Sequence, residues 1–145
     1  MVRSFVFVCL FVLVVPVIGC GEPKSSKEED SHAQAEHAHG LTLNQGSQWE
    51  MDSHTRSIFE QMATSFREGN VESGEREVIK TTGKKIRGEI NDLIRGCTME
   101  GEAHDQLHKY LAAYVPAVDR MARSGTKADA DGVGALLDLY PTYFR

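Results

Sequence analysis

The sequence predicts an all-α domain over residues 41–145, folded as an up-down four-helix bundle. Apolar residues recur at three-and-four spacing in four successive stretches, and no stretch shows the sustained alternation of a strand. The stretches are separated by short segments containing glycine, and short connections place consecutive helices antiparallel. A chain of 145 residues that is 41% hydrophobic has room for one ordinary domain.

The first helix is expected to begin at a capping box formed by Ser47 and Glu50, and to end at Gly69-Asn70. Its apolar face consists of Met51, Thr55, Ile58, Phe59, Met62 and Phe66. The second helix carries Gly83 and Gly88, each of which weakens a helix by roughly 1 kcal/mol relative to alanine, so packing must stabilise it. Its face consists of Ile79, Ile86, Ile90, Leu93 and Cys97.

A turn bracketed by Gly96 and Gly101 leads to the third helix, which we expect Pro116 to kink or split because proline lacks the backbone N–H. The face of this helix is formed by His104, Leu107, His108, Leu111, Val115, Val118 and Ala122. Thr126 with Asp129 is a predicted cap for the fourth helix, and Pro141 is expected to end it. Its shorter face is Val133, Leu136, Leu137 and Tyr140.

The amino terminus has the pattern of a signal peptide over residues 1–19. Arg3 precedes eleven apolar residues, Phe5–Val15, fewer than the 20 or so that a membrane-spanning helix needs. Val17-Ile18-Gly19-Cys20 resembles the lipobox of bacterial lipoproteins. The resemblance implies cleavage before Cys20, acylation of its thiol with a lipid such as palmitate, and a lipid-anchored protein on the extracytoplasmic, periplasmic side of the bacterial cell envelope. An ordinary signal peptide or an uncleaved anchor is the alternative.

Residues 20–40 are expected to form a flexible linker after the lipidated cysteine. Residues 21–40 contain no valine, isoleucine, leucine or aromatic residue, so they cannot bury enough apolar surface to fold. His32, His37 and His39 lie there among acidic residues, a composition that binds divalent metals weakly or serves only as a polar linker. The net charge of −5 argues against a general nucleic-acid-binding protein, which would need a basic face.

Soft metal ligands are concentrated at the turn between the second and third helices. If Cys9 leaves with the signal peptide and Cys20 carries lipid, Cys97 is the one free thiol. His104 and His108 are one helical turn apart, a spacing that lets two imidazoles bind one ion. With Met99 they form a donor set that suits copper. In the expected topology, Met51 and His54 from the first helix reach the same end of the bundle and are predicted as further contacts.

Two metals fit these donors. Two imidazoles, one thiolate and a weak thioether resemble blue-copper centres in ligand identity only, because those centres lie in β-sandwich folds. Without Met99, the set of Cys97, His104 and His108 with water or Glu100 would suit zinc, which is therefore the second choice. No Cys-x-x-Cys-His is present, which excludes covalent c-type haem.

The sequence therefore predicts a membrane-tethered extracytoplasmic copper-binding protein for copper handling or storage. The alternative is a cofactor-free helical lipoprotein with a structural or partner-binding role, in which the cysteine and histidines only pack or pair with acids. An enzyme is not expected, because no nucleophile elbow, phosphate-binding glycine loop or His-Glu-x-x-His is present. A Cys97–His104 thiolate–imidazolium pair is the one arrangement that would revive an enzymatic role.

Overall fold

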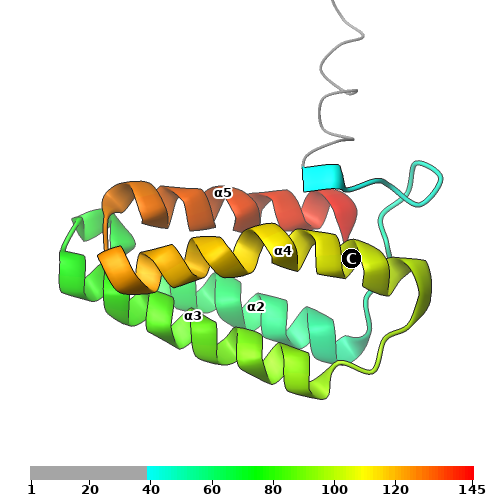
Figure 1. Ribbon diagram of the computed structural model, residues 1–145, viewed down its shortest axis with the longest axis horizontal. Helices are drawn as coiled ribbons and strands as arrows, with labels where there is room; N and C mark the ends of the chain where they lie inside the picture. Colours follow the sequence, from blue (N-terminus) through cyan, green and yellow to red (C-terminus); the bar gives the residue numbers. More distant parts are fainter. Residues whose placement is uncertain (1–38) are drawn as a thin grey trace, which may run out of the picture.

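The computed structural model describes residues 39–145, which fold as four α-helices packed against one another in chain order (Figure 1). The predicted signal peptide, Cys20, His32 and His37 lie outside the described residues. The elements are α2 (Ser53–Glu68), a short 3-10 turn η2 (Val71–Ser73), α3 (Arg76–Gly96), α4 (Gly101–Ser124) and α5 (Lys127–Tyr143). The predicted all-α, up-down bundle is confirmed. Within residues 39–145, none of the helices combines the length and apolar character needed to cross a membrane.

The expected capping box at the first helix was wrong. The cap of α2 is Asp52, whose carboxylate accepts a hydrogen bond of 2.7 Å from the backbone N–H of Thr55. Ser47 instead pairs with Asn44 in a tight turn through two backbone hydrogen bonds of 2.8 and 2.9 Å. The residues between this turn and Asp52 are extended because they pair with the end of the chain, so the helix cannot start earlier.

The expectation that Pro141 ends the last helix was wrong, and Pro116 does not split the third helix. Pro116 lies inside α4, which runs without interruption, and Pro141 lies inside α5, which continues to Tyr143. Proline removes one helical hydrogen bond, but packing on both sides of it can hold a helix together. Tyr114 and Ala117 are buried on either side of Pro116, and Tyr143 is buried just beyond Pro141.

The predicted apolar faces of the first two helices are mostly buried. On α4 the prediction was only partly right, because Tyr110 and Tyr114 are fully buried while His108, on the predicted face, is exposed. The most deeply buried side chains come from all four helices and include Met62, Ile79, Ile86, Ile90, Leu93, Leu107, Tyr110, Tyr114, Val118 and Val133. Gly83 allows a close approach of α3 to α4, because a Cβ at this position would overlap the backbone of Ala122. The glycine that weakens the isolated helix thus permits its packing in the bundle. The predicted caps of α5, Thr126 and Asp129, are present as expected.

Residues 39–52 cover one end of the bundle and tie it to the carboxyl terminus (Figure 1). The backbone of Thr42 accepts a hydrogen bond from the Trp49 indole at 2.6 Å, and its N–H donates to the Gln106 side chain of α4 at 3.1 Å. The backbone N–H of Trp49 donates a hydrogen bond to the Tyr143 carbonyl at 2.7 Å. The backbone carbonyl of Trp49 accepts one from the Arg145 N–H at 2.9 Å. Trp49, which is buried, therefore joins this segment to the carboxyl-terminal residues.

Candidate functional site

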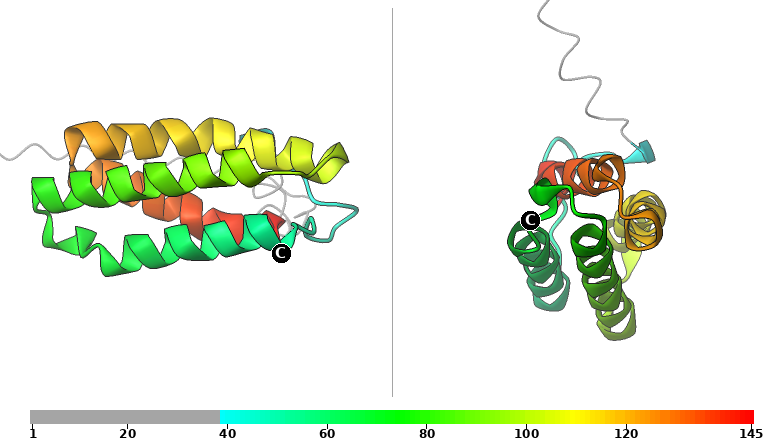
Figure 2. Two further views of the ribbon diagram at one scale, coloured as in Figure 1. Left: turned by 90° about the horizontal axis from the view of Figure 1, so that it is seen from below. Right: turned by 90° about the vertical axis from the view of Figure 1, so that its left-hand side faces the viewer.

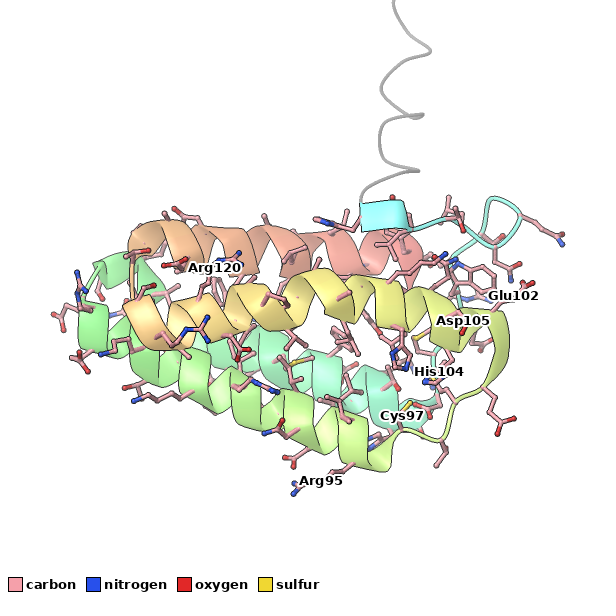
Figure 3. All side chains as sticks on the ribbon, in the orientation of Figure 1. Arg95, Cys97, Glu102, His104, Asp105 and Arg120 are labelled. Atoms are coloured by element: carbon pink, nitrogen blue, oxygen red, sulfur yellow. The ribbon has the colours of Figure 1, made fainter. Side chains whose placement is uncertain are left out.

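The predicted metal ligands gather at the end of the bundle where α3 passes into α4. Figure 3 shows Cys97 and His104 at this end, both beside the α3–α4 connection. Cys97 is the half-buried residue that caps the carboxyl end of α3, and its thiol is free. Met99 lies in the connection, His104 in the first turn of α4 and His54 at the start of α2. The antiparallel topology therefore brings these segments together as expected.

The imidazoles of His104 and His108 converge. Their Nε2 atoms lie 2.9 Å apart, and the two rings are nearly perpendicular, with centroids 4.4 Å apart and an interplanar angle of 82°. His104 is half-buried against the bundle and His108 is exposed. At this separation one ring donates a hydrogen bond from its Nε2–H to the Nε2 of the other, or both direct their lone pairs at a shared cation. The pair is open to solvent on the side of His108.

Met99 is held against the start of α2 by a hydroxyl group. The Thr55 side chain donates to the Met99 sulfur at 3.5 Å, and the Thr55 backbone is itself fixed by the Asp52 cap. Burial opposes ionisation of Asp52, but hydrogen bonds from Thr55 outweigh it and hold the pKa of this carboxyl below its usual range. The chain Asp52–Thr55–Met99 thus anchors the α3–α4 connection to α2.

His54 provides a third imidazole at this end. Its Nε2 atom is buried and has no hydrogen-bond partner among the described residues. The ring lies against Gly96, since a Cβ at residue 96 would overlap it. His54 therefore reaches the residue that precedes Cys97. Met51, the other further contact expected from the sequence, is 1% exposed and belongs to the apolar core.

The donors share one end of the bundle but do not form a complete coordination sphere. In the part of the chain from residue 39 onward, no three His, Cys, Asp or Glu side chains are grouped closely enough to hold a metal ion. The converging pair of imidazoles is therefore the part of the expected site that is assembled. Cys97 and Met99 lie in the α3–α4 connection at the same end of the bundle, and the Met99 sulfur contacts Thr55 of α2.

Two contributors were not identified from the sequence. Thr55 looked like part of an apolar stripe, and nothing in the pattern indicated that its hydroxyl meets Met99. Gly96 and Gly101 flank the α3–α4 turn as expected, but the sequence did not indicate that Gly96 provides the space for the His54 ring. Comparison of the chain with protein-family models, curated proteins and solved structures gave no match, so the functional argument rests on this geometry.

Proposed function

We propose that this protein binds a copper ion at the α3–α4 junction, with His104 and His108 as its first two ligands. The observation that carries the proposal is the 2.9 Å separation of their Nε2 atoms. With metal–nitrogen distances of about 2.0–2.1 Å, this separation corresponds to an angle of about 90° at the ion. Such an angle suits tetragonal copper(II), whereas tetrahedral zinc would require the nitrogens to be about 3.3 Å apart.

The remaining ligands come from the connection between the helices. Cys97 and Met99 belong to the four residues that separate α3 from α4, and Glu100, at the start of α4, makes no side-chain capping bond. For Cys97 and Met99 to complete the site, both sulfur atoms must move toward the imidazole pair, and the Met99 sulfur must leave the Thr55 hydroxyl that it contacts here. Both are soft donors that favour copper over zinc. The exposed position of His108 gives an incoming ion access from solvent, which supports copper handling.

The test is a copper titration of protein in which His32, His37 and His39 are changed to glutamine. This background removes the linker imidazoles and leaves His54, His104 and His108 as the histidines of the chain. One copper ion should bind per chain, and His104→Gln or His108→Gln should lower the affinity at least about tenfold. Cys97→Ala should also weaken binding and change the optical spectrum. Unchanged affinity in both histidine variants would refute the proposal.

A second function is a cofactor-free domain that binds a protein partner. It is favoured by the finding that no three-residue group of metal ligands is assembled within residues 39–145. In that case the 2.9 Å contact of His104 and His108 is an ordinary hydrogen bond between neutral imidazoles. Copper would then bind the histidine-depleted background no more tightly than it binds the double variant His104→Gln/His108→Gln.

We further propose that the domain is tethered to the extracytoplasmic side of a bacterial membrane through lipid on Cys20. The support is the lipobox-like segment Val17–Cys20, which follows a short apolar run. Labelling of cells with a palmitate analogue should mark the protein, and Cys20→Ala should abolish the label and release the protein from membranes. Persistent membrane association of an unlabelled Cys20→Ala protein would indicate an uncleaved anchor instead.

A further inference from the structure

A groove of about 590 Å³ lies between α2 and α5, the first and last helices of the bundle. Figure 2 shows the four helices end-on, with α5 (orange to red) packed between α4 and α2. Ligand sites for small molecules commonly have volumes of about 300–1,000 Å³ and apolar walls, so this groove has the size of such a site. Its apolar lining consists of Phe59, Ala63, Phe66, Leu137, Tyr140 and Pro141.

Small residues line the groove on both helices. Ala63 faces it from α2, and Gly134 faces it from α5. A Cβ at residue 134 would lie 3.2 Å from the Phe66 ring, so the glycine allows that ring to lie close to α5. At the other end the rings of Phe59 and Tyr140 stack with centroids 3.8 Å apart. The groove therefore has an aromatic wall along its length.

The rim of the groove carries an excess of positive charge. Arg56, Arg67 and Arg145 line it together with two carboxylates, Glu60 and Asp138, although the whole chain has a net charge of −5. Within the described part of the chain, Arg56 and Arg67 form no ion pair: Arg56 donates to a backbone carbonyl and Arg67 to a threonine hydroxyl. Arg145 reaches Glu50 only at 3.9 Å between two exposed side chains, a contact of little energetic value.

We propose that this groove binds a single-chain amphiphile with an anionic headgroup, of which a medium-chain fatty acid is the simplest example. Arg56 and Arg145 lie at the end formed by the start of α2 and the end of α5, so two guanidinium groups can meet the headgroup there. The distance along α2 from Arg56 to Arg67 is about 16 Å, enough for an extended alkyl chain over Phe59 and Phe66. This proposal is independent of the copper site.

The probe is decanoate, compared by calorimetry with decyltrimethylammonium, which has the same chain and the opposite charge. We expect one decanoate per protein and at least about tenfold weaker binding of the cation, because charge-assisted hydrogen bonds select the anion. Arg56→Gln/Arg145→Gln should remove this preference while leaving the fold intact. The proposal would be overturned if the two amphiphiles bound with equal affinity. It would also be overturned if decanoate did not bind, the result expected when the groove instead binds a helix of a partner protein.

Steric block of the groove provides a second test. Ala63→Phe fills the groove and should lower decanoate affinity by at least about tenfold. Ala128→Phe is the matched control, since Ala128 is exposed on α5 and does not line the groove. Circular dichroism and thermal unfolding should show both variants folded. If folded Ala63→Phe bound decanoate with unchanged affinity, the amphiphile would bind elsewhere and the assignment to this groove would be overturned. If Ala63→Phe did not fold, the charge preference of the arginine variants would test the assignment instead.

Discussion

The buried Nε2 atom of His54 lies directly against Gly96, so the last residue of α3 has no room for a side chain. Gly96→Ala should therefore displace the imidazole and destabilise the fold by about 1–2 kcal/mol, although alanine ordinarily favours a helix over glycine. Urea unfolding measures this change. If His54 contributes to copper binding, the same variant should also lower copper affinity.

Gly88→Ala is the control for this prediction. Gly88 is exposed on the same helix, and a Cβ there meets no atom within 4 Å. The substitution should stabilise the protein by about 0.5–1 kcal/mol because only the helix propensity changes. Stabilisation of similar size by both alanine variants would show that the His54 ring moves away from Gly96 without cost.

The position of the first helix cap can be tested by two alanine substitutions. Asp52→Ala should cost about 1 kcal/mol, because the carboxylate caps α2 and, through Thr55, supports Met99. Ser47→Ala should have little effect, since the tight turn at Ser47 is held by backbone hydrogen bonds. Chemical denaturation compares the two. The opposite ranking would restore Ser47 as the cap.

Two buried tyrosines should respond differently to loss of their hydroxyl groups. Tyr110 donates a hydrogen bond of 2.8 Å to the Leu136 carbonyl, whereas the buried Tyr114 hydroxyl has no partner among residues 39–145. Tyr110→Phe should cost about 1–2 kcal/mol, and Tyr114→Phe should be neutral or stabilising. Burial also raises the pKa of both phenols, so neither should ionise in the native protein below strongly alkaline pH. Ultraviolet titration would detect earlier ionisation.

Acid should weaken the start of α5. Hydrogen bonds from the Ser124 and Thr126 hydroxyls lower the pKa of Asp129 below its usual value near 3.8. A depressed native pKa contributes stability above the unfolded value, and this contribution disappears as pH falls through the native pKa. Asp129→Asn should thus be less stable than the parent protein by about 1 kcal/mol at pH 7, and the difference should shrink as the pH falls below the usual carboxyl pKa and through the lower native pKa.

Asp138→Asn serves as the control for the acid experiment. The Asp138 carboxylate is exposed and makes no hydrogen bond or ion pair within the described chain. Its removal should change the unfolding free energy little at any pH. A constant difference between Asp129→Asn and the parent from pH 7 to pH 2 would show that the effect of Asp129 does not depend on its charge.

The fold was predictable because the spacing of apolar residues indicates where each helix lies and which of its faces is buried. The stripes from Ile58 to Met62 and from Ile79 to Leu93 are buried as expected, and short connections left few topologies. The helix ends were less predictable, since they depend on distant partners. α2 begins only at Ser53 because the backbone of Trp49 pairs with Tyr143 and Arg145. α5 continues beyond Pro141 to Tyr143, whose side chain is buried.

The candidate site was predictable where it depends on spacing within one helix. The separation of four residues allowed the rings of His104 and His108 to meet, because it places both side chains on one face of the helix, one turn apart. The surroundings depend on contacts between helices. The meeting of Thr55 with Met99, and of His54 with Gly96, requires the relative positions of α2 and the α3–α4 connection, which no local pattern contains. Copper binding itself stays a prediction.

The pairing of Trp49 with Phe144 has a topological consequence. Since the extended segment around Trp49 is hydrogen-bonded to the residues that flank Phe144, the two ends of the described domain lie side by side. A circular permutant that links Arg145 back to His39 through a short flexible peptide, and opens the chain between α4 and α5 at Gly125, should retain the native spectrum. The order in which the helices are synthesised would then be separable from the way they assemble.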